Sequence, residues 1–315
     1  MTIKDTLATV QTEVRKVVLG QDDAVAHLMT ALLAQGHVLL EGVPGIAKTL
    51  LCKAVARCLG ADFKRVQCTP DLMPADITGT NVFDLHERTF RLVKGPVFTN
   101  LLLVDEINRT PPKTQAALLQ AMQEHCVTID GVDHRLDSLF CVIATQNPIE
   151  YEGTYPLPEA QLDRFLMKVL VGYPDPAAEH DILRLHLQGR DPQDLEAAGV
   201  QAVVGRADLD AATRELAAQT VQEEVMAYLL ELVRRTRESP HTTLGASPRA
   251  AVALMRCAQI RAAVEGRDYL IPDDVQDMAH PVLRHRIILK PEAEIEGLTV
   301  DRLLESVITS VPVPR

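Results

Sequence analysis

The sequence predicts an α/β fold over residues 1–172, with a mainly parallel sheet between two layers of helices, followed by an all-helical domain over residues 173–315. Two observations predict this division. Short apolar runs alternate with helix-length segments in the first part, which is typical of buried parallel strands and their crossover helices. After Gly172-Tyr173-Pro174 the strand-like runs stop and helical spacing remains. The length of 315 residues also fits about two domains.

The expected elements follow one another in a regular order. The strands of the sheet are expected at 37–41, 62–68, 101–106, 140–145 and 167–171. The helices of the first domain are expected at 2–17, 22–34, 50–60 and 111–124, with another beginning near 159. Two hairpins interrupt this order: 82–84 pairs with 89–93, and 127–129 pairs with 135–136 around an Asp-Gly turn signal. The helices of the second domain are expected at 177–188, 208–217, 221–238, 248–264, 272–284 and 299–309, and 190–207 is expected as a loop with a short strand or helix.

The composition excludes several classes of protein. Hydrophobic residues make up 47% and charged residues 24%, as in ordinary globular domains. No apolar run approaches the roughly 18 residues of a membrane span, and the N-terminus lacks the layout of a signal peptide. The six cysteines show no CxxC spacing and are expected to be buried thiols of a cytoplasmic protein. A net charge of −11, with 3% aromatic residues, argues against a general nucleic-acid surface.

A glycine-rich loop between the first strand and the next helix has the residue types that hold a nucleotide phosphate. It reads Gly42-Val43-Pro44-Gly45-Ile46-Ala47-Lys48-Thr49 and leads into Leu50. Glycines let successive N–H groups face one anion, and a helix N-terminus adds partial positive charge. Lys48 can reach the β- and γ-phosphates, and Thr49 can ligate Mg²⁺. The general pattern has Gly in place of Ala47, whose methyl fits if the residue has helical dihedrals. The alternative is an ordinary strand–turn–helix.

Polar side chains follow two of the other strands. Asp105 and Glu106 end an apolar strand, the place where open α/β sheets bind ligands. Asp105 suits the Mg²⁺ shell, and Glu106 suits orientation and deprotonation of the attacking water; the alternative is a pair of solvated acids. Asn147 comes just after the next strand and can hold the water or the γ-phosphate, or else form an Asn-Pro turn.

Two arginines are candidates for neutralising charge on the transferred phosphoryl group. Arg164 lies near a helix end and is expected to serve a neighbouring subunit; the alternative is a surface ion pair with Asp163 or Glu159. Arg249 opens a helix of the second domain and could couple the domains through the γ-phosphate, or else be a solvated arginine. Arg109 follows the acidic pair and could face a neighbour, but a surface role is favoured. The histidines show no ligand spacing, so no metal beyond nucleotide-bound Mg²⁺ is expected.

Together these motifs resemble AAA+ ATPases, most closely the MoxR family, over almost the whole chain. Beyond the loop, the matching segments are Leu103-Val104-Asp105-Glu106-Ile107-Asn108-Arg109-Thr110-Pro111, Ala144-Thr145-Gln146-Asn147-Pro148, Glu159-Ala160-Gln161-Leu162-Asp163-Arg164-Phe165 and Ser247-Pro248-Arg249. They resemble Walker B, sensor 1, the arginine-finger segment and sensor 2. Leu19-Gly20-Gln21 resembles the segment that packs on adenine. Family members resemble this chain in having Ala or Gly at position 47, so Ala47 is not taken as inactivating.

The resemblance implies a P-loop three-layer sandwich with a helical lid, and ATP with Mg²⁺ at their junction. It implies a ring, by analogy hexameric, in which both hairpins point toward the central pore. The segment 190–217 resembles an insertion that moves the lid, so Arg249 is expected at its own or at a neighbour's nucleotide. Relatives are chaperone-like ATPases that mature or activate partner proteins, often with a separate von Willebrand factor A-domain protein.

Two other functions of the same fold stay open at this stage. One is a chelatase-like motor for metal insertion, which the sequence does not distinguish without its partner. The other is a helicase-like nucleic-acid motor, since such relatives carry the same two hairpins. A DNA-tracking hairpin should have Lys or Arg at its tip, whereas here the tip reads Asp130-Gly131-Val132-Asp133-His134. Nucleic acid is therefore not the expected partner.

Overall fold

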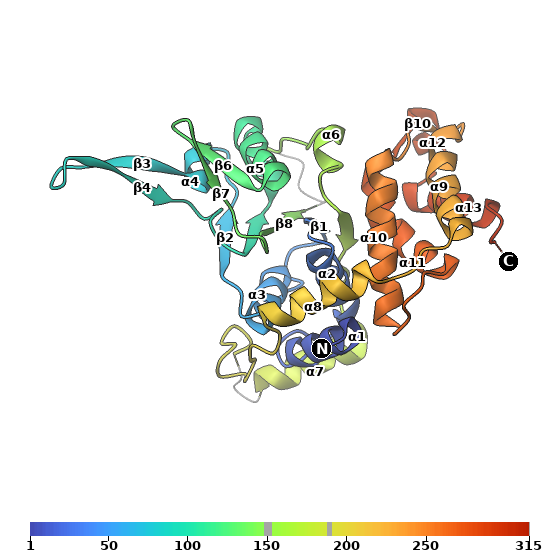
Figure 1. Cartoon of the computed structure of the whole chain (residues 1–315), viewed down its shortest axis with the longest axis horizontal. Helices are drawn as coiled ribbons and strands as arrows, with labels where there is room; N and C mark the ends of the chain where they lie inside the picture. Colours follow the sequence, from blue (N-terminus) through green and yellow to red (C-terminus); the bar gives the residue numbers. More distant parts are fainter. Residues whose placement is uncertain (148–152, 188–190, 315) are drawn as a thin grey trace.

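A five-stranded parallel sheet forms the centre of the computed structural model, which describes residues 1–147, 153–187 and 191–314 (Figure 1). Its strand order is β2-β5-β8-β1-β9, and every neighbouring pair is parallel. The strands are β1 (Val38–Glu41), β2 (Phe63–Gln67), β5 (Leu101–Asp105), β8 (Cys141–Gln146) and β9 (Met167–Leu170). The expected strands are thus confirmed, with ends that differ by at most one residue.

Helices cover both faces of this sheet, and alternate residues of each strand face one layer or the other. Leu40, Leu103 and Ile143 share a hydrophobic core with α1 (Ile3–Val14), α2 (Asp22–Leu33) and α3 (Lys48–Cys58). Leu39, Leu102 and Val142 pack in a second core with α4 (Pro74–Thr78) and α5 (Pro112–Glu124). The three-layer sandwich is therefore confirmed. The short helices η1 (Ile107–Arg109) and α6 (Glu159–Leu162) follow β5 and precede β9.

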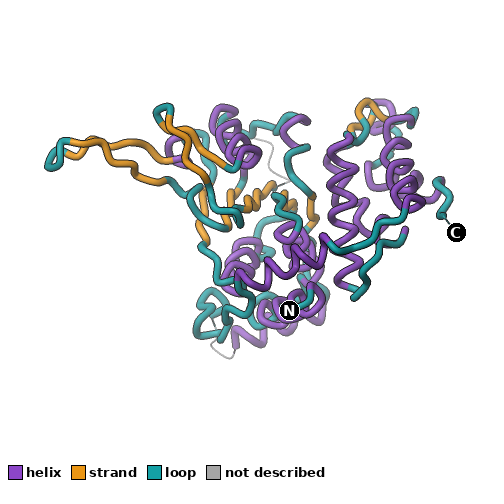
Figure 2. The backbone as a smooth tube through the Cα atoms, viewed as in Figure 1, coloured by secondary structure: helices purple, strands orange, loops and turns teal. Residues whose placement is uncertain are grey.

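Both expected hairpins are present, and one of them projects far from the body of the molecule (Figure 2). It consists of β3 (Gly79–Asp84) and β4 (Thr89–Lys94). The second consists of β6 (Cys126–Ile129) and β7 (Val132–Arg135), and its turn is tighter than expected. Residues 132–133 belong to the strand instead of the loop, because Asp130 and Gly131 have φ angles of 49° and 80° and close a two-residue turn.

The C-terminal part forms a helical bundle beside the sheet, at the right of Figure 1. It contains α9 (Glu223–Glu238), α10 (Pro248–Val264), α11 (Pro272–Leu283), the turn η2 (Arg284–Arg286), α12 (Pro291–Ile295) and α13 (Val300–Ser310). The expectation that strands stop after Gly172 was wrong. Two short strands, β10 (Thr242–Leu244) and β11 (Ile288–Leu289), pair antiparallel within this bundle. Such short strands, like the five-residue α12, carry too few residues to show a period in the sequence.

Two helices after Gly172 lie beneath the sheet domain, and the second of them also contacts α10 of the helical bundle (Figure 1). They are α7 (Pro176–Leu187) and α8 (Arg206–Ala217). The Glu215 carboxylate accepts a hydrogen bond from the Ile3 N–H at 3.0 Å, and the loop before α8 bonds to Cys58 and Glu13. The boundary expected near residue 173 stays a prediction. Pro148 of the sensor-1 segment and residues 188–190 lie outside the described residues.

The sequence predicted buried thiols and no membrane-spanning segment. Five cysteines are buried, Cys126 is partly buried, and all six are free. Burial raises the pKa of the Cys68 thiol to about 11, which leaves it protonated and unreactive at neutral pH. No helix in the described part of the chain is both long and apolar enough to cross a bilayer.

Candidate active site

The phosphate loop leaves the carboxyl end of β1 and enters α3 with an unusual backbone. Gly45 has a φ of 87°, and Ala47 has a φ of 61° and a ψ of 25°. The condition under which the Ala47 methyl fits without strain is therefore not met, because this residue lies in the left-handed region that favours glycine. A side chain there costs about 1 kcal/mol. At Gly42 a Cβ atom would lie 2.6 Å from Ile46 Cδ1 and still closer to the Val171 carbonyl, so only glycine fits.

The first backbone N–H groups of α3 and the Lys48 side chain lie beside the loop. No side chain caps the N-terminus of α3, so its first N–H groups remain available to an anion. Lys48 is half-buried, and its ammonium donates to the Gly42 carbonyl at 2.5 Å. Burial lowers the pKa of Lys48, while Asp105, Glu106 and Glu41 raise it. The lysine therefore lies in the field of the same acids that the sequence singled out.

The two acids end β5 and are held by a neighbouring threonine. Thr145 donates its hydroxyl to Asp105 Oδ1 at 2.6 Å and accepts the Glu106 N–H at 2.8 Å. The other Asp105 oxygen accepts from Arg65 Nη2 at 2.6 Å. Glu106 has left-handed dihedrals, φ 59° and ψ 52°, which is strain of the kind that clusters at functional sites. Neither Thr145 nor Arg65 was predicted as a site residue from the sequence; the signal for Thr145 was its place at the end of the strand next to the acids.

The Glu106 carboxylate is not a free solvated acid in this structure. Its Oε2 accepts from Gln67 Nε2 and from Arg109 Nη1, each at 3.2 Å. Arg109 therefore lies against the acid of its own subunit. Asn147 follows β8 directly and is buried, at the same edge of the sheet. The structure thus brings Lys48, Asp105, Glu106 and Asn147 to one edge, where the sequence analysis placed them.

A cavity of about 550 Å³ adjoins this edge between the sheet domain and the lid. Gly20, with a φ of 70°, and Gln21 form one wall, and the Gln21 amide donates to the Gly172 carbonyl at 2.9 Å. The lid supplies Pro281 and Arg284 to the opposite wall. Arg284 was missed by the sequence analysis, although the basic run Arg284-His285-Arg286 at a helix end was a signal for it.

Arg164 and Arg249 do not meet the phosphate loop of their own chain. They line one separate cavity of about 180 Å³, together with Arg256, Gly36 and His37. Gly36 and His37 precede β1, whereas the loop follows it, and a four-residue strand spans about 13 Å. Asp163, offered as an ion-pair partner for Arg164, instead pairs with Arg286 at 2.7 Å. The two arginines therefore share a site at the opposite end of β1.

This sheet order, with a phosphate loop after β1 and two acids at the end of β5, defines the class of P-loop ATPases known as AAA+. Residues 37–167 match the family described as "ATPase family associated with various cellular activities (AAA)", and residues 234–307 match the AAA lid domain. A crystal structure from Cytophaga hutchinsonii superposes with a TM-score of 0.90 and 41% identity, covering 99% of this chain and 96% of that one.

Curated relatives narrow the class to one family. The chain is 42% identical over 313 residues to Chaperone MoxR1 of Mycobacterium tuberculosis, covering 96% of this chain and 81% of that protein. It is 34% identical to Protein MoxR of Methylorubrum extorquens, with 99% and 96% covered, and 46% identical to YeaC of Bacillus subtilis, with 96% and 92% covered. The chain belongs to the MoxR family of AAA+ ATPases and is an ATP-hydrolysing enzyme.

Proposed function

We propose that this chain works as a ring, by family analogy a hexamer, in which each subunit's phosphate loop is completed by Arg164 and Arg249 of the next subunit. The observation that supports this proposal is the shared cavity of the two arginines at the far end of β1. Arg164 and Arg249 cannot reach a phosphate in their own subunit's loop, because the loop lies at the opposite end of β1. A heterologous contact, repeated around a closed ring, supplies them with one.

The residues at the sheet edge fit ATP with Mg²⁺. Thr49 and Asp105 offer a hydroxyl and a carboxylate oxygen, which is the donor chemistry that Mg²⁺ prefers. The metal, when bound, neutralises charge on the β- and γ-phosphates. Gly42 to Leu50 surround the phosphates, while Gly20 and Gln21 contact the adenine side. Lys48 leaves the Gly42 carbonyl to bind phosphate oxygens.

Hydrolysis then needs a base and charge stabilisation. Glu106, once released from Gln67 and Arg109, takes a proton from the attacking water, and Asn147 orients that water. The new bond joins the water oxygen to the γ-phosphorus, and the bond to the β-phosphate oxygen breaks, giving ADP and phosphate. Arg164 and Arg249 of the neighbour offset the charge that develops on the transferred group.

The work of hydrolysis reaches a client through the hairpins. The β3–β4 ribbon exposes Phe83, Leu85 and Phe90, and the two phenylalanine rings stack edge to face at 5.2 Å. Asn81 of this ribbon donates to Asp130 at the tip of the second hairpin at 2.8 Å, so the two move together. Apolar side chains on the ribbon, beside the acidic tip of the second hairpin, suit a polypeptide better than a phosphate backbone. The activity proposed is chaperone-like remodelling of partner proteins in the cytoplasm, with a von Willebrand factor A-domain protein as a partner.

A subunit-mixing assay tests the shared site. Arg164→Ala and Glu106→Gln chains should each hydrolyse ATP poorly, because one donates no arginine and the other has no base. Random mixing at equal amounts should restore activity at about one site in four, where an Arg164→Ala loop meets an intact neighbour. Arg234→Ala, an exposed arginine of α9, is the control and should be active alone. A mixture no more active than its parts contradicts the shared site.

A further inference from the structure

The turn η2 faces two different sites within three residues. Arg284 lines the 550 Å³ cavity of the subunit's own nucleotide side, and its Nε lies 3.2 Å from Asp301 Oδ1. Arg286, two residues later, points the other way and is only 6% exposed. A displacement of the lid at Arg284 therefore moves Arg286 as well.

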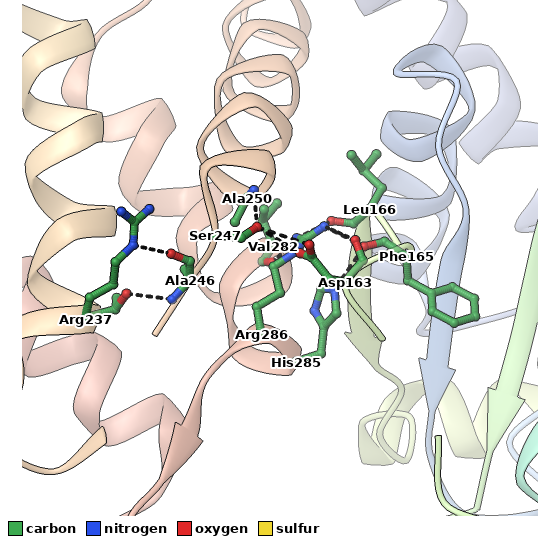
Figure 3. Close-up of polar contacts among 11 residues, drawn as sticks. Asp163, Phe165, Leu166, Arg237, Ala246, Ser247, Ala250, Val282, His285 and Arg286 are labelled. Carbon is green, nitrogen blue, oxygen red and sulfur yellow. Dashed lines mark hydrogen bonds and ion pairs between the residues drawn. The ribbon is translucent and has the colours of Figure 1, made fainter. Parts of the chain in front are cut away.

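Arg286 holds the segment that carries Arg164 (Figure 3). Its Nε donates to Asp163 Oδ1 at 2.7 Å, its Nη2 to the Phe165 carbonyl at 2.7 Å, and its Nη1 to the Leu166 carbonyl at 3.0 Å. The neighbouring His285 ring also lies 3.0 Å from the Phe165 carbonyl. A buried guanidinium cannot leave such partners without being stranded unpaired away from water, so the segment must follow the turn.

The same carboxylate also reaches the helix that carries Arg249. Ser247 donates its hydroxyl to Asp163 Oδ2 at 3.1 Å, and Ser247 is the N-cap of α10, where it accepts the Ala250 N–H. Arg249 stands two residues after this cap. Asp163 therefore links, through one side chain, the two arginines that line the 180 Å³ cavity.

We propose that η2, with Arg286 and Asp163 as positioning residues, couples the nucleotide in a subunit's own site to the placement of the two arginines that it offers to its neighbour. This inference rests on the proposed shared site and adds its regulation. Nucleotide entering the own cavity displaces Arg284 and Pro281. The displacement passes through Arg286 to Asp163, and from there to Arg164 and Arg249. Neighbouring sites should then hydrolyse ATP cooperatively.

The mixing assay can be turned into a test of this link. An Arg164→Ala chain serves as the acceptor, with an intact loop. A Glu106→Gln donor, which retains its own ATP, should restore at least fivefold more activity than a Lys48→Ala donor, whose own site is empty. Adding Asp163→Asn to the Glu106→Gln donor should reduce the restored activity to the Lys48→Ala level. Adding Asp163→Asn to the acceptor should leave the restored activity within twofold, since the acceptor's arginines are not used.

A second variant and a matched control separate this role from general damage to the lid. Ser247→Ala leaves the Arg286 contacts in place and should weaken the donor alone, by a smaller factor. Asp274→Asn breaks another buried pair, Arg267–Asp274 at 2.6 Å, inside the lid, and should affect donor and acceptor equally. The wild-type chain should show a Hill coefficient above 1 for ATP, and Asp163→Asn should lower it toward 1.

Each outcome decides one of the two proposals. If Arg164→Ala and Glu106→Gln chains fail to complement at all, the shared site is wrong and the inference goes with it. If they complement, but Lys48→Ala donors do as well as Glu106→Gln donors, the coupling is refuted while the shared site stands. Equal loss from Asp163→Asn in donor and acceptor, or a wild-type Hill coefficient of 1, likewise refutes only the coupling.

Discussion

The two ends of β1 are built on different physical principles. At the carboxyl end the backbone is strained, because Ala47 and Glu106 both have left-handed dihedrals. The Lys48 ammonium there donates to a backbone carbonyl, and the partly exposed Glu106 carboxylate accepts from two side chains at 3.2 Å each. At the amino end Arg286 is buried, and all three of its nitrogens donate to the segment that carries Arg164. We expect the first end to rearrange when a ligand binds, and the second to transmit that movement. In the ring that we propose, each subunit thus combines a responsive half-site with a rigid one.

Removing the chemistry of the responsive end should give the largest effect. Lys48→Ala should abolish ATP binding and turnover, and Glu106→Gln should lower turnover about 100-fold or more while ATP still binds, because only proton transfer is lost. Steady-state hydrolysis and equilibrium nucleotide binding measure the two quantities. Near wild-type turnover in both variants would overturn the assignment of this end.

Removing the cations of the rigid end should lower turnover without changing nucleotide affinity. We expect Arg164→Ala and Arg249→Ala each to lose about 1,000-fold in turnover, since an arginine that stabilises the transition state contributes this much. The Kd for ATP, measured on isolated subunits by dilution below assembly, should stay unchanged. A weakened Kd in isolated Arg249→Ala subunits would place that arginine at its own nucleotide and break the comparison.

Acid should destabilise the rigid end. Burial lowers the pKa of His37 to about 4, and burial and Arg286 lower that of His285 well below its ordinary value. The folded state binds fewer protons than the unfolded state below pH about 6.5, so stability falls as pH drops from there toward 4. His37 alone accounts for about 3 kcal/mol over this range. Urea unfolding at pH 7.5, 6 and 5 measures the loss, and a flat profile would contradict it.

Relieving strain at the phosphate loop should give the smallest effect. Ala47→Gly removes a methyl group from the left-handed region and should raise the free energy of unfolding by about 0.5–1 kcal/mol, after the entropy that glycine loses. Thermal unfolding without nucleotide measures it, with Ala56→Gly in the last turn of α3 as a control that should be destabilising. A loss of stability at position 47 would show that the left-handed geometry is not strained.

The sequence predicted the responsive end better than the rigid one, for a physical reason. The phosphate loop, the two acids and the Asn147 amide each follow an apolar strand. Because parallel strands end at the same edge of a sheet, this pattern alone brings Lys48, Asp105 and Asn147 together. Asp163, Ser247 and Arg286 are up to 123 residues apart, and no local pattern joins them. Their contacts depend on how the lid packs. The left-handed Ala47 also escaped prediction, because alanine itself favours ordinary helix.

The exposed β3–β4 ribbon has a practical consequence, because the chain contains no tryptophan. Phe90 is 72% exposed on that ribbon, which projects away from the body of the molecule (Figure 1). A tryptophan introduced by Phe90→Trp would be the one indole of the chain. The wavelength of its fluorescence emission would therefore report directly when a polypeptide contacts the ribbon. The exposed ribbon is therefore a suitable place for a fluorescent reporter of client binding.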